Sequence, residues 1–176
     1  MNYLTEESLS EFLIKAFPYE TFIRNKKVNE SGINGRPDFR SITSKIIVEF
    51  NGYRHYSQSS VILADETKRN AYAKLCYKVI EIPYFVQLST YTVKELFDIT
   101  LNINQTFPHG FISDTAMLPA DFCFLGIERF KSDLERLPLI KKDIANSLEN
   151  KIKELGDERY VLPPSINLKN LSNIIK

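Results

Sequence analysis

Two acidic residues are the strongest candidates for chemistry, because each lies beside an apolar run that a sheet would bury. Asp38 opens a short extended segment, and Glu49 interrupts the apolar run 46–50. A carboxylate inside a buried strand is costly unless a partner offsets its desolvation. A lone acid would most simply be neutralised by a basic side chain such as Arg54 or Arg69. Two acids on neighbouring strands repel each other, however, and a hard divalent cation is the usual reason to hold them together.

The residues that follow Glu49 also suit a metal site. Side chains alternate between the faces of a strand, so Glu49 and Asn51 project together and Phe50 projects from the opposite side. Asp38, Glu49 and the main-chain carbonyl of Phe50 would supply oxygen ligands for Mg²⁺, with Mn²⁺ as the alternative. A metal held there can polarise a phosphoryl oxygen and activate a water molecule. The pattern therefore indicates hydrolysis of a phosphodiester.

The hydrophobic pattern predicts the elements that position these acids. A helix is expected from residue 5 to residue 17, followed by strands over 19–28, 37–42 and 45–50, a helix over 61–76 and a strand over 78–82. Short connections make the first three strands an antiparallel meander. The helical crossover makes the last strand parallel to the strand that carries Glu49. The expected fold is α/β, of order α-β-β-β-α-β, with a mixed sheet flanked by helices.

The remainder of the chain is predicted to be helical. Helices are expected over 92–103, 124–137 and 139–155, with Pro138 separating the last two and Gly156 as a C-cap. We interpret residues 1–103 as the α/β core and residues 104–176 as a helical extension packed on it, together forming one compact domain.

Composition excludes several classes of protein. The 176 residues, 43% hydrophobic and 26% charged, are ordinary for a globular protein large enough to bury a core. Cys76 and Cys123 can build neither a disulfide framework nor a zinc site. The N-terminus lacks the basic and apolar segments of a signal peptide, and no stretch approaches the roughly 18 apolar residues of a membrane span. We therefore expect a cytoplasmic protein with no membrane partner.

Basic residues are concentrated in and beside the predicted meander. The formal net charge is only +1, so binding to a polyanion would have to depend on such a local cluster. The cluster consists of Arg24, Lys26, Lys27, Arg36 and Arg40. Its alternative interpretation is ordinary surface charge on an edge strand.

Two predicted helices carry further polar residues that could face the acids. Glu6 lies at the edge of the apolar stripe of the first helix, where it would face a cleft or simply complement the helix dipole. Asp65, Lys68, Arg69 and Tyr72 share one face of the second helix. That face would either be solvated and rich in ion pairs or, if the helix packs beside Glu49, point into the site.

The order and spacing of these residues resemble those of the PD-(D/E)xK nuclease superfamily. Pro37-Asp38 and Glu49-Phe50-Asn51 match its pattern, with Asn51 where the pattern usually has Lys. The string VEFNGYRH at 48–55, then Asp65 and Lys68, then YKVIEIP at 77–83, is similar to one branch of the superfamily. That branch contains the very-short-patch repair endonucleases and related restriction and homing enzymes. The resemblance covers about residues 5–90.

The resemblance implies a restriction-endonuclease-like fold and roles for individual residues. Asp38 and Glu49 would be metal ligands, joined by Asp65 and, from the first helix, by Glu6. His55 would orient or deprotonate the attacking water, or would only be a hydrogen-bonded residue at a strand end.

The residue that departs from the family pattern is Asn51. Asn cannot supply the positive charge that Lys places near the nucleophile. Lys68, Lys45 or His55 would have to replace it, with Lys68 also able to contact a phosphate. The basic cluster would then neutralise backbone phosphates.

The resulting hypothesis is a Mg²⁺-dependent endonuclease of the type II restriction kind that cuts double-stranded DNA. Cutting both strands needs two active sites and hence favours a homodimer. The alternatives are a repair, recombination or homing-type nuclease, and a catalytically inert, nuclease-like DNA-binding module, which Asn51 favours. Residues 104–176 would serve DNA recognition or dimerisation.

Overall fold

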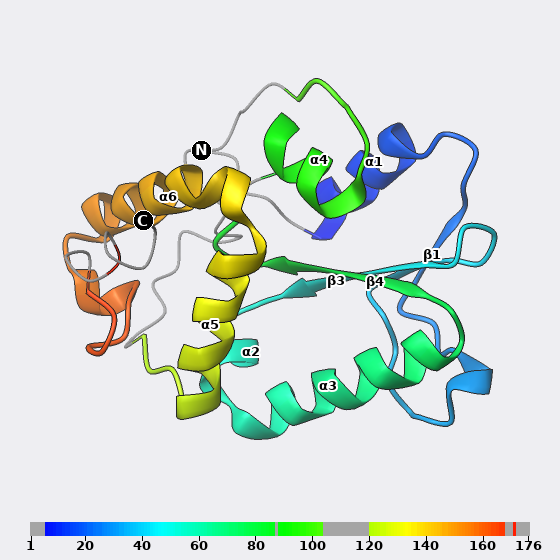
Figure 1. Cartoon of the computed structure of the whole chain (residues 1–176), viewed down its shortest axis with the longest axis horizontal. Helices are drawn as coiled ribbons and strands as arrows, with labels where there is room; N and C mark the ends of the chain where they lie inside the picture. The colour runs from blue at the N-terminus through cyan, green and yellow to red at the C-terminus, as the bar shows by residue number, and fades with distance from the viewer. Residues whose placement is uncertain (1–5, 87, 104–119, 168–170, 172–176) are drawn as a thin grey trace.

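The chain folds around a mixed sheet that has helices on both of its faces (Figure 1). The computed structural model describes residues 6–86, 88–103, 120–167 and 171, with side chains from residue 8 onward. Within these ranges the strands are β1 (Phe22–Arg24), β2 (Phe39–Ser41), β3 (Ile46–Asn51) and β4 (Lys78–Pro83). The α-helices are α1 (Glu6–Ala16), α2 (Arg54–Ser57), α3 (Ser59–Lys74), α4 (Thr90–Phe97), α5 (Phe124–Arg136) and α6 (Lys141–Leu155). Short 3₁₀ turns are η1 (Asn29–Ser31), η2 (Pro138–Ile140) and η3 (Glu158–Tyr160).

The four described strands lie in the order β1-β2-β3-β4. β1 pairs with β2, and β2 with β3, in antiparallel fashion. β4 runs parallel to β3, because α3 carries the chain back across the sheet. These findings confirm the predicted α/β class, the antiparallel meander and the parallel crossover. The element order is also the predicted one, with α2 and η1 in addition.

Three predicted elements are shorter than expected. β2 covers only Phe39–Ser41 of the predicted strand 37–42. In β1 and α4, a polar residue in left-handed conformation ends the regular structure. β1 stops before Asn25, which has φ 48° and donates its N–H to the carbonyl of Asp38. α4 stops before Asp98, which has φ 57° and donates its N–H to the carbonyl of Lys94. Asn and Asp tolerate this conformation better than other non-glycine residues. The predicted strand to residue 28 and the predicted helix to residue 103 are therefore corrected.

The two faces of the sheet are covered differently. α3 packs on one face, where Ile47 and Tyr72 join Val28 and Tyr77 in a small buried cluster. α1 and α4 lie on the other face (Figure 1). There a large cluster combines side chains of α1 and the sheet with side chains of α5 and α6, so that the helices of the extension share the core. The chain segment at the predicted boundary, 104–119, lies outside the described residues.

α5 and α2 lie beyond the carboxyl ends of β3 and β4 and are in close contact (Figure 1). Gly126 of α5 allows this approach, since a Cβ atom there would lie 1.6 Å from the carbonyl oxygen of Tyr56. The same carbonyl accepts the N–H of Cys123 at the start of α5. α5 is thereby fixed next to the sheet end that carries Glu49. None of the described helices is long and apolar enough to cross a membrane.

Candidate active site

Asp38 directly precedes β2 and lies opposite Glu49 of the neighbouring strand β3. The β2–β3 register pairs Phe39 with Val48, and continuing it by one residue places Asp38 across from Glu49. The main chain links them in both directions, because the Phe50 N–H donates to Asp38 Oδ2 at 2.7 Å and the Asp38 N–H lies 3.4 Å from Glu49 Oε2. Directly opposite residues project from the same face of a sheet. The structure therefore brings together the two acids that the sequence singled out.

The Glu49 carboxyl is poorly compensated. Glu49 is only 8% exposed. Burial raises the pKa of Glu49 from its usual 4.5 to about 7, with Asp38 adding repulsion and Lys68 opposing the rise. Near neutral pH, a further cation that neutralises the pair would therefore stabilise the folded protein.

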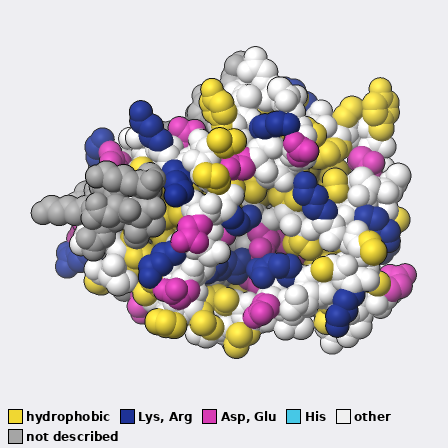
Figure 2. Space-filling model, in the orientation of Figure 1, with side chains coloured by type: hydrophobic (Ala, Val, Ile, Leu, Met, Phe, Trp, Pro, Cys, Tyr) yellow, Lys and Arg dark blue, Asp and Glu magenta, His cyan; other side chains and the backbone are white. Residues whose placement is uncertain are grey.

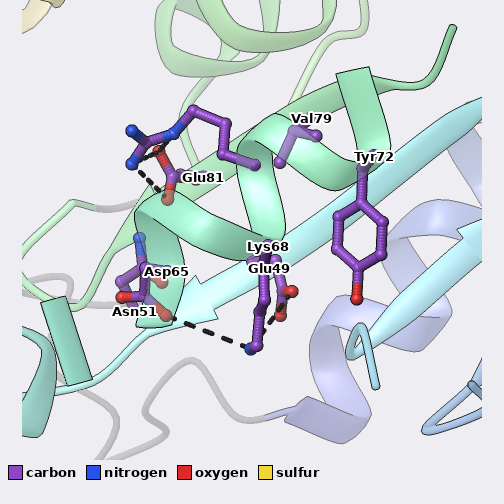
Figure 3. Close-up of a pocket in the computed structure, with 8 residues that line it drawn as sticks. Glu49, Asn51, Asp65, Lys68, Tyr72, Val79 and Glu81 are labelled. Carbon is purple, nitrogen blue, oxygen red and sulfur yellow. Dashed lines mark hydrogen bonds and ion pairs between the residues drawn. The ribbon is translucent and has the colours of Figure 1, made fainter. Parts of the chain in front are cut away.

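Lys68 is the basic side chain that reaches Glu49 from α3. Its Nζ lies 3.5 Å from Glu49 Oε1 and 4.0 Å from Asp65 Oδ1. Figure 3 shows Lys68 and Glu49 directed toward each other, with Asp65 and Asn51 beside them and the Tyr72 hydroxyl on the same side. The face of α3 that carries Asp65, Lys68 and Tyr72 thus points toward the Glu49 strand, as the second interpretation required.

Asn51 is buried on the same face of β3 as Glu49, and Tyr72 covers this face from α3. Among the described residues, neither Asn51 Nδ2 nor the Tyr72 hydroxyl has a hydrogen-bond partner. Burial and the negative charge of Glu49 raise the pKa of Tyr72 to about 12, so this hydroxyl keeps its proton. Two hydrogen-bond donors without acceptors therefore lie next to the acids.

A second group of acids lies on the same side of the sheet and is fully compensated. Arg129 of α5 donates from Nη1 to Asp65 Oδ2 at 2.7 Å and from Nη2 to Glu81 Oε1 at 3.0 Å. Arg69 binds the Glu81 carboxylate through two further hydrogen bonds. His55 Nδ1 lies 2.5 Å from Asp65 Oδ2. Figure 2 shows basic and acidic side chains gathered where α3 and α5 meet.

The pKa values of these acids reflect their partners. Burial by itself would raise the pKa of Asp65, but the hydrogen bonds from His55 and Arg129 outweigh it and lower the pKa. Burial by itself would also raise the pKa of Glu81. The hydrogen bond from Arg69 and the charges of Arg129 and Arg136 outweigh burial, so the pKa of Glu81 is lowered. Asp65 and Glu81 are thus held ionised, unlike Glu49.

Two carboxylates, those of Asp38 and Glu49, could supply oxygen ligands to a divalent cation. Within the described side chains, no group of three His, Cys, Asp or Glu residues comes together to hold a metal. Asp65 is turned toward His55 and Arg129. A hard cation fits the two acids chemically, since it accepts water and main-chain oxygens as further ligands. The roles of Asp65 and of the Phe50 carbonyl as ligands stay predictions, and the Glu6 side chain lies outside the described side chains.

Four of the five residues predicted to contact nucleic acid are exposed. Arg24, Lys26, Lys27 and Arg36 lie at the surface, and the Arg24 guanidinium packs over the ring of Phe39. Arg40 is different, since it is 8% exposed and lies on the face of β2 that also carries Asp38. The predicted contacts with nucleic acid stay predictions.

Sequence reasoning missed Arg129 and Glu81. Glu81 interrupts an apolar strand as Glu49 does, so the same pattern would have revealed it. Arg129, Asp133 and Arg136 share a face of α5, where Arg136 binds Asp133 at 2.7 Å and the Glu81 carbonyl at 2.9 Å. That spacing alone is typical of a solvated helix face, so it gave no signal of contact with the site.

Comparison of the chain with protein-family models, with curated proteins and with solved structures finds no match.

Proposed function

We propose that the protein is a divalent-metal-dependent endonuclease that hydrolyses phosphodiester bonds in DNA through the site at Asp38 and Glu49. The observation that carries the proposal is the placement of these two acids across neighbouring strands, with the Glu49 pKa raised to about 7 by burial. Structural acids usually have partners that hold their pKa low, and poorly compensated buried acids are concentrated at functional sites.

Each residue of the site has a role in this proposal. Asp38 and Glu49 hold the cation, which when bound polarises a phosphoryl oxygen and lowers the pKa of a water molecule. Lys68 supplies the positive charge that Asn51 cannot, from a point 3.5 Å from Glu49 Oε1. His55, held by Asp65 through Nδ1, would transfer a proton through its other ring nitrogen. The fold proposed for this arrangement is the restriction-endonuclease-like one.

The substrate we propose is double-stranded DNA cut in the manner of a restriction enzyme, by a homodimer that carries two sites. A repair, recombination or homing-type nuclease is distinguished from it by preference for mismatched, branched or long asymmetric DNA.

The test uses Asp38→Asn and Glu49→Gln with supercoiled plasmid and Mg²⁺ or Mn²⁺. Because each variant removes one carboxylate charge, we expect cleavage to fall by about 10²–10³-fold or more. Glu149→Gln and Asp143→Asn, on the exposed side of α6, are matched controls that should cleave normally. Metal-dependent cleavage that survives in both site variants would refute the assignment.

A second readout separates metal binding from turnover. Mg²⁺ or Mn²⁺ should raise the melting temperature of the wild-type protein and of the controls, and should do so much less in the two site variants. A catalytically inert DNA-binding module is the second candidate, and the Lys68–Glu49 ion pair favours it, since that pair can also act as plain neutralisation. An inert module would bind DNA without cleaving it under any of these metals.

A further inference from the structure

A basic groove lies at the turn end of the β2–β3 hairpin, away from the end that carries Asp38 and Glu49. It has a volume of about 420 Å³. Its charged lining consists of four basic side chains and one acid: Lys26, Lys27, Arg40, Lys45 and Glu30. The excess of positive charge is therefore local, in a chain whose formal net charge is only +1.

Arg40 is the strongest indication that the groove takes a ligand. Arg40 is more than nine-tenths buried, lines the groove, and among the described residues its Nε has no hydrogen-bond partner. No acidic side chain of the described part forms a salt bridge with it. A buried guanidinium is expected to be paired, because its desolvation otherwise costs several kcal/mol. An anion entering the groove would supply the missing partner.

The walls of the groove indicate what accompanies that anion. Ile42 is 53% exposed, and the Lys45 ammonium lies 4.6 Å from the centre of the Tyr77 ring. The groove therefore combines an apolar wall with several cations. A phosphate attached to a sugar and a base matches this pairing, whereas a bare inorganic anion would leave the apolar wall unused.

We propose that this groove binds one nucleotide unit of a nucleic-acid strand, with its phosphate on Arg40 and its sugar and base against Ile42. The inference rests on the proposed function for the identity of the ligand as nucleic acid.

The groove is separate from the acid pair but close to it. Asp38 and Arg40 project from the same face of β2, roughly 7 Å apart along the strand. Ile47 lies opposite Arg40 on β3. On this face of the sheet, Ile47 packs with Tyr72 and Val28. The phosphate at Arg40 is therefore a different one from the phosphate at the acids, and both can belong to one strand. The groove would hold the strand in register for the bond to be cut.

The experiment measures binding of fluorescent 12-nucleotide DNA by anisotropy, in EDTA and over a series of salt concentrations. Lys26→Gln combined with Lys45→Gln changes two exposed side chains, and Arg40→Gln changes the buried one. The double variant should bind about tenfold more weakly, and the slope of log K against log salt should fall by about 2. Lys141→Gln combined with Lys142→Gln on α6 is the matched control for the loss of two positive charges and should bind like wild type. Melting curves check that Arg40→Gln remains folded.

The outcomes separate the groove from the catalytic proposal. If the groove variants bind like wild type, the groove assignment is wrong even if the protein cleaves DNA. If they bind weakly and no variant ever cleaves, the groove stands and the catalytic proposal fails. Equally tight, groove-dependent binding of a poly-glutamate peptide would overturn the nucleotide assignment.

Discussion

Two pairs of acids, each with one buried and one half-buried member, lie on the α3 side of the sheet and differ in how they are neutralised. Asp65 and Glu81 share Arg129, and their pKa values are lowered. Among the described residues, the basic partner of Glu49 is Lys68 at 3.5 Å, and the Glu49 pKa is raised to about 7. The first pair explains how the chain holds α5 against the core. The second is left poorly compensated by the same chain, which is what a site for an external cation requires.

The largest effect is expected from breaking the compensated pair. Arg129→Met should lower the free energy of unfolding by about 3–5 kcal/mol, because it removes the shared partner of the buried Asp65 and the half-buried Glu81. It leaves these two acids with the hydrogen bonds to His55 and Arg69. Lys131→Met removes an exposed lysine of the same helix, paired with Glu128, and should cost less than about 1 kcal/mol. Urea unfolding at pH 7 measures both changes. If the two variants lose similar stability, Arg129 contributes no more to the folded state than an exposed lysine, and the interpretation of its ion pairs is wrong.

The poorly compensated pair should make the stability of the protein depend on pH. Because the folded-state pKa of Glu49 lies above its usual 4.5, its folded state favours the protonated carboxyl, and stability falls as pH rises from about 4.5 through about 7. Without divalent metal, this should lower wild-type stability by about 3 kcal/mol relative to Glu49→Gln across that range. The lowered pKa values of Asp65 and Glu81 act in the opposite direction, and both proteins share that contribution.

Urea unfolding of wild type and Glu49→Gln in EDTA, at intervals between pH 4.5 and 8, isolates the Glu49 contribution. Parallel stability curves would show that Glu49 is already neutralised in the folded protein.

The smallest expected effect is the difference in stability loss between substitutions of two buried tyrosines. Tyr72→Phe removes a hydroxyl without a partner in the described part and should change the free energy of unfolding by less than about 1 kcal/mol. Tyr56→Phe removes a hydroxyl that donates to Asp133 Oδ2 at 2.6 Å and should cost about 1–3 kcal/mol. Thermal unfolding of both variants measures the difference. A larger loss in Tyr72→Phe than in Tyr56→Phe would mean that Tyr72 has an acceptor.

Much of the sheet was predictable, because its pattern is local. The apolar run around Glu49 predicted a covered strand, and the spacing of the next helix and strand predicted the parallel crossover. The ends of β1 and α4 were not predictable in this way. Asn25 and Asp98 end them through left-handed backbone conformations, and hydrophobic periodicity carries no signal of such a change.

The candidate site shows a similar limit. The juxtaposition of Asp38 and Glu49 followed from residue type and strand alternation, whereas helical spacing left open whether Lys68 faces solvent or the site. Which buried acid would be neutralised did not follow, because Arg129 lies far along the chain and its reach depends on how α5 docks at Gly126. Glu49 and Glu81 have the same local pattern, and only the tertiary structure separates them.

The reach of Arg129 also has a consequence for how the chain folds. Its ion pairs join residues 64 and 48 positions apart, and the Tyr56–Asp133 hydrogen bond joins residues 77 apart. Closing such long loops loses more chain entropy than pairing the neighbouring strands of the meander, so we expect these contacts to form after the meander. Before α5 docks, Asp65 and Glu81 would be hydrated. Docking of α5 would bury both carboxylates and pair them with Arg129 at the same time. We therefore expect docking of α5 to couple folding of the sheet to folding of the later helices.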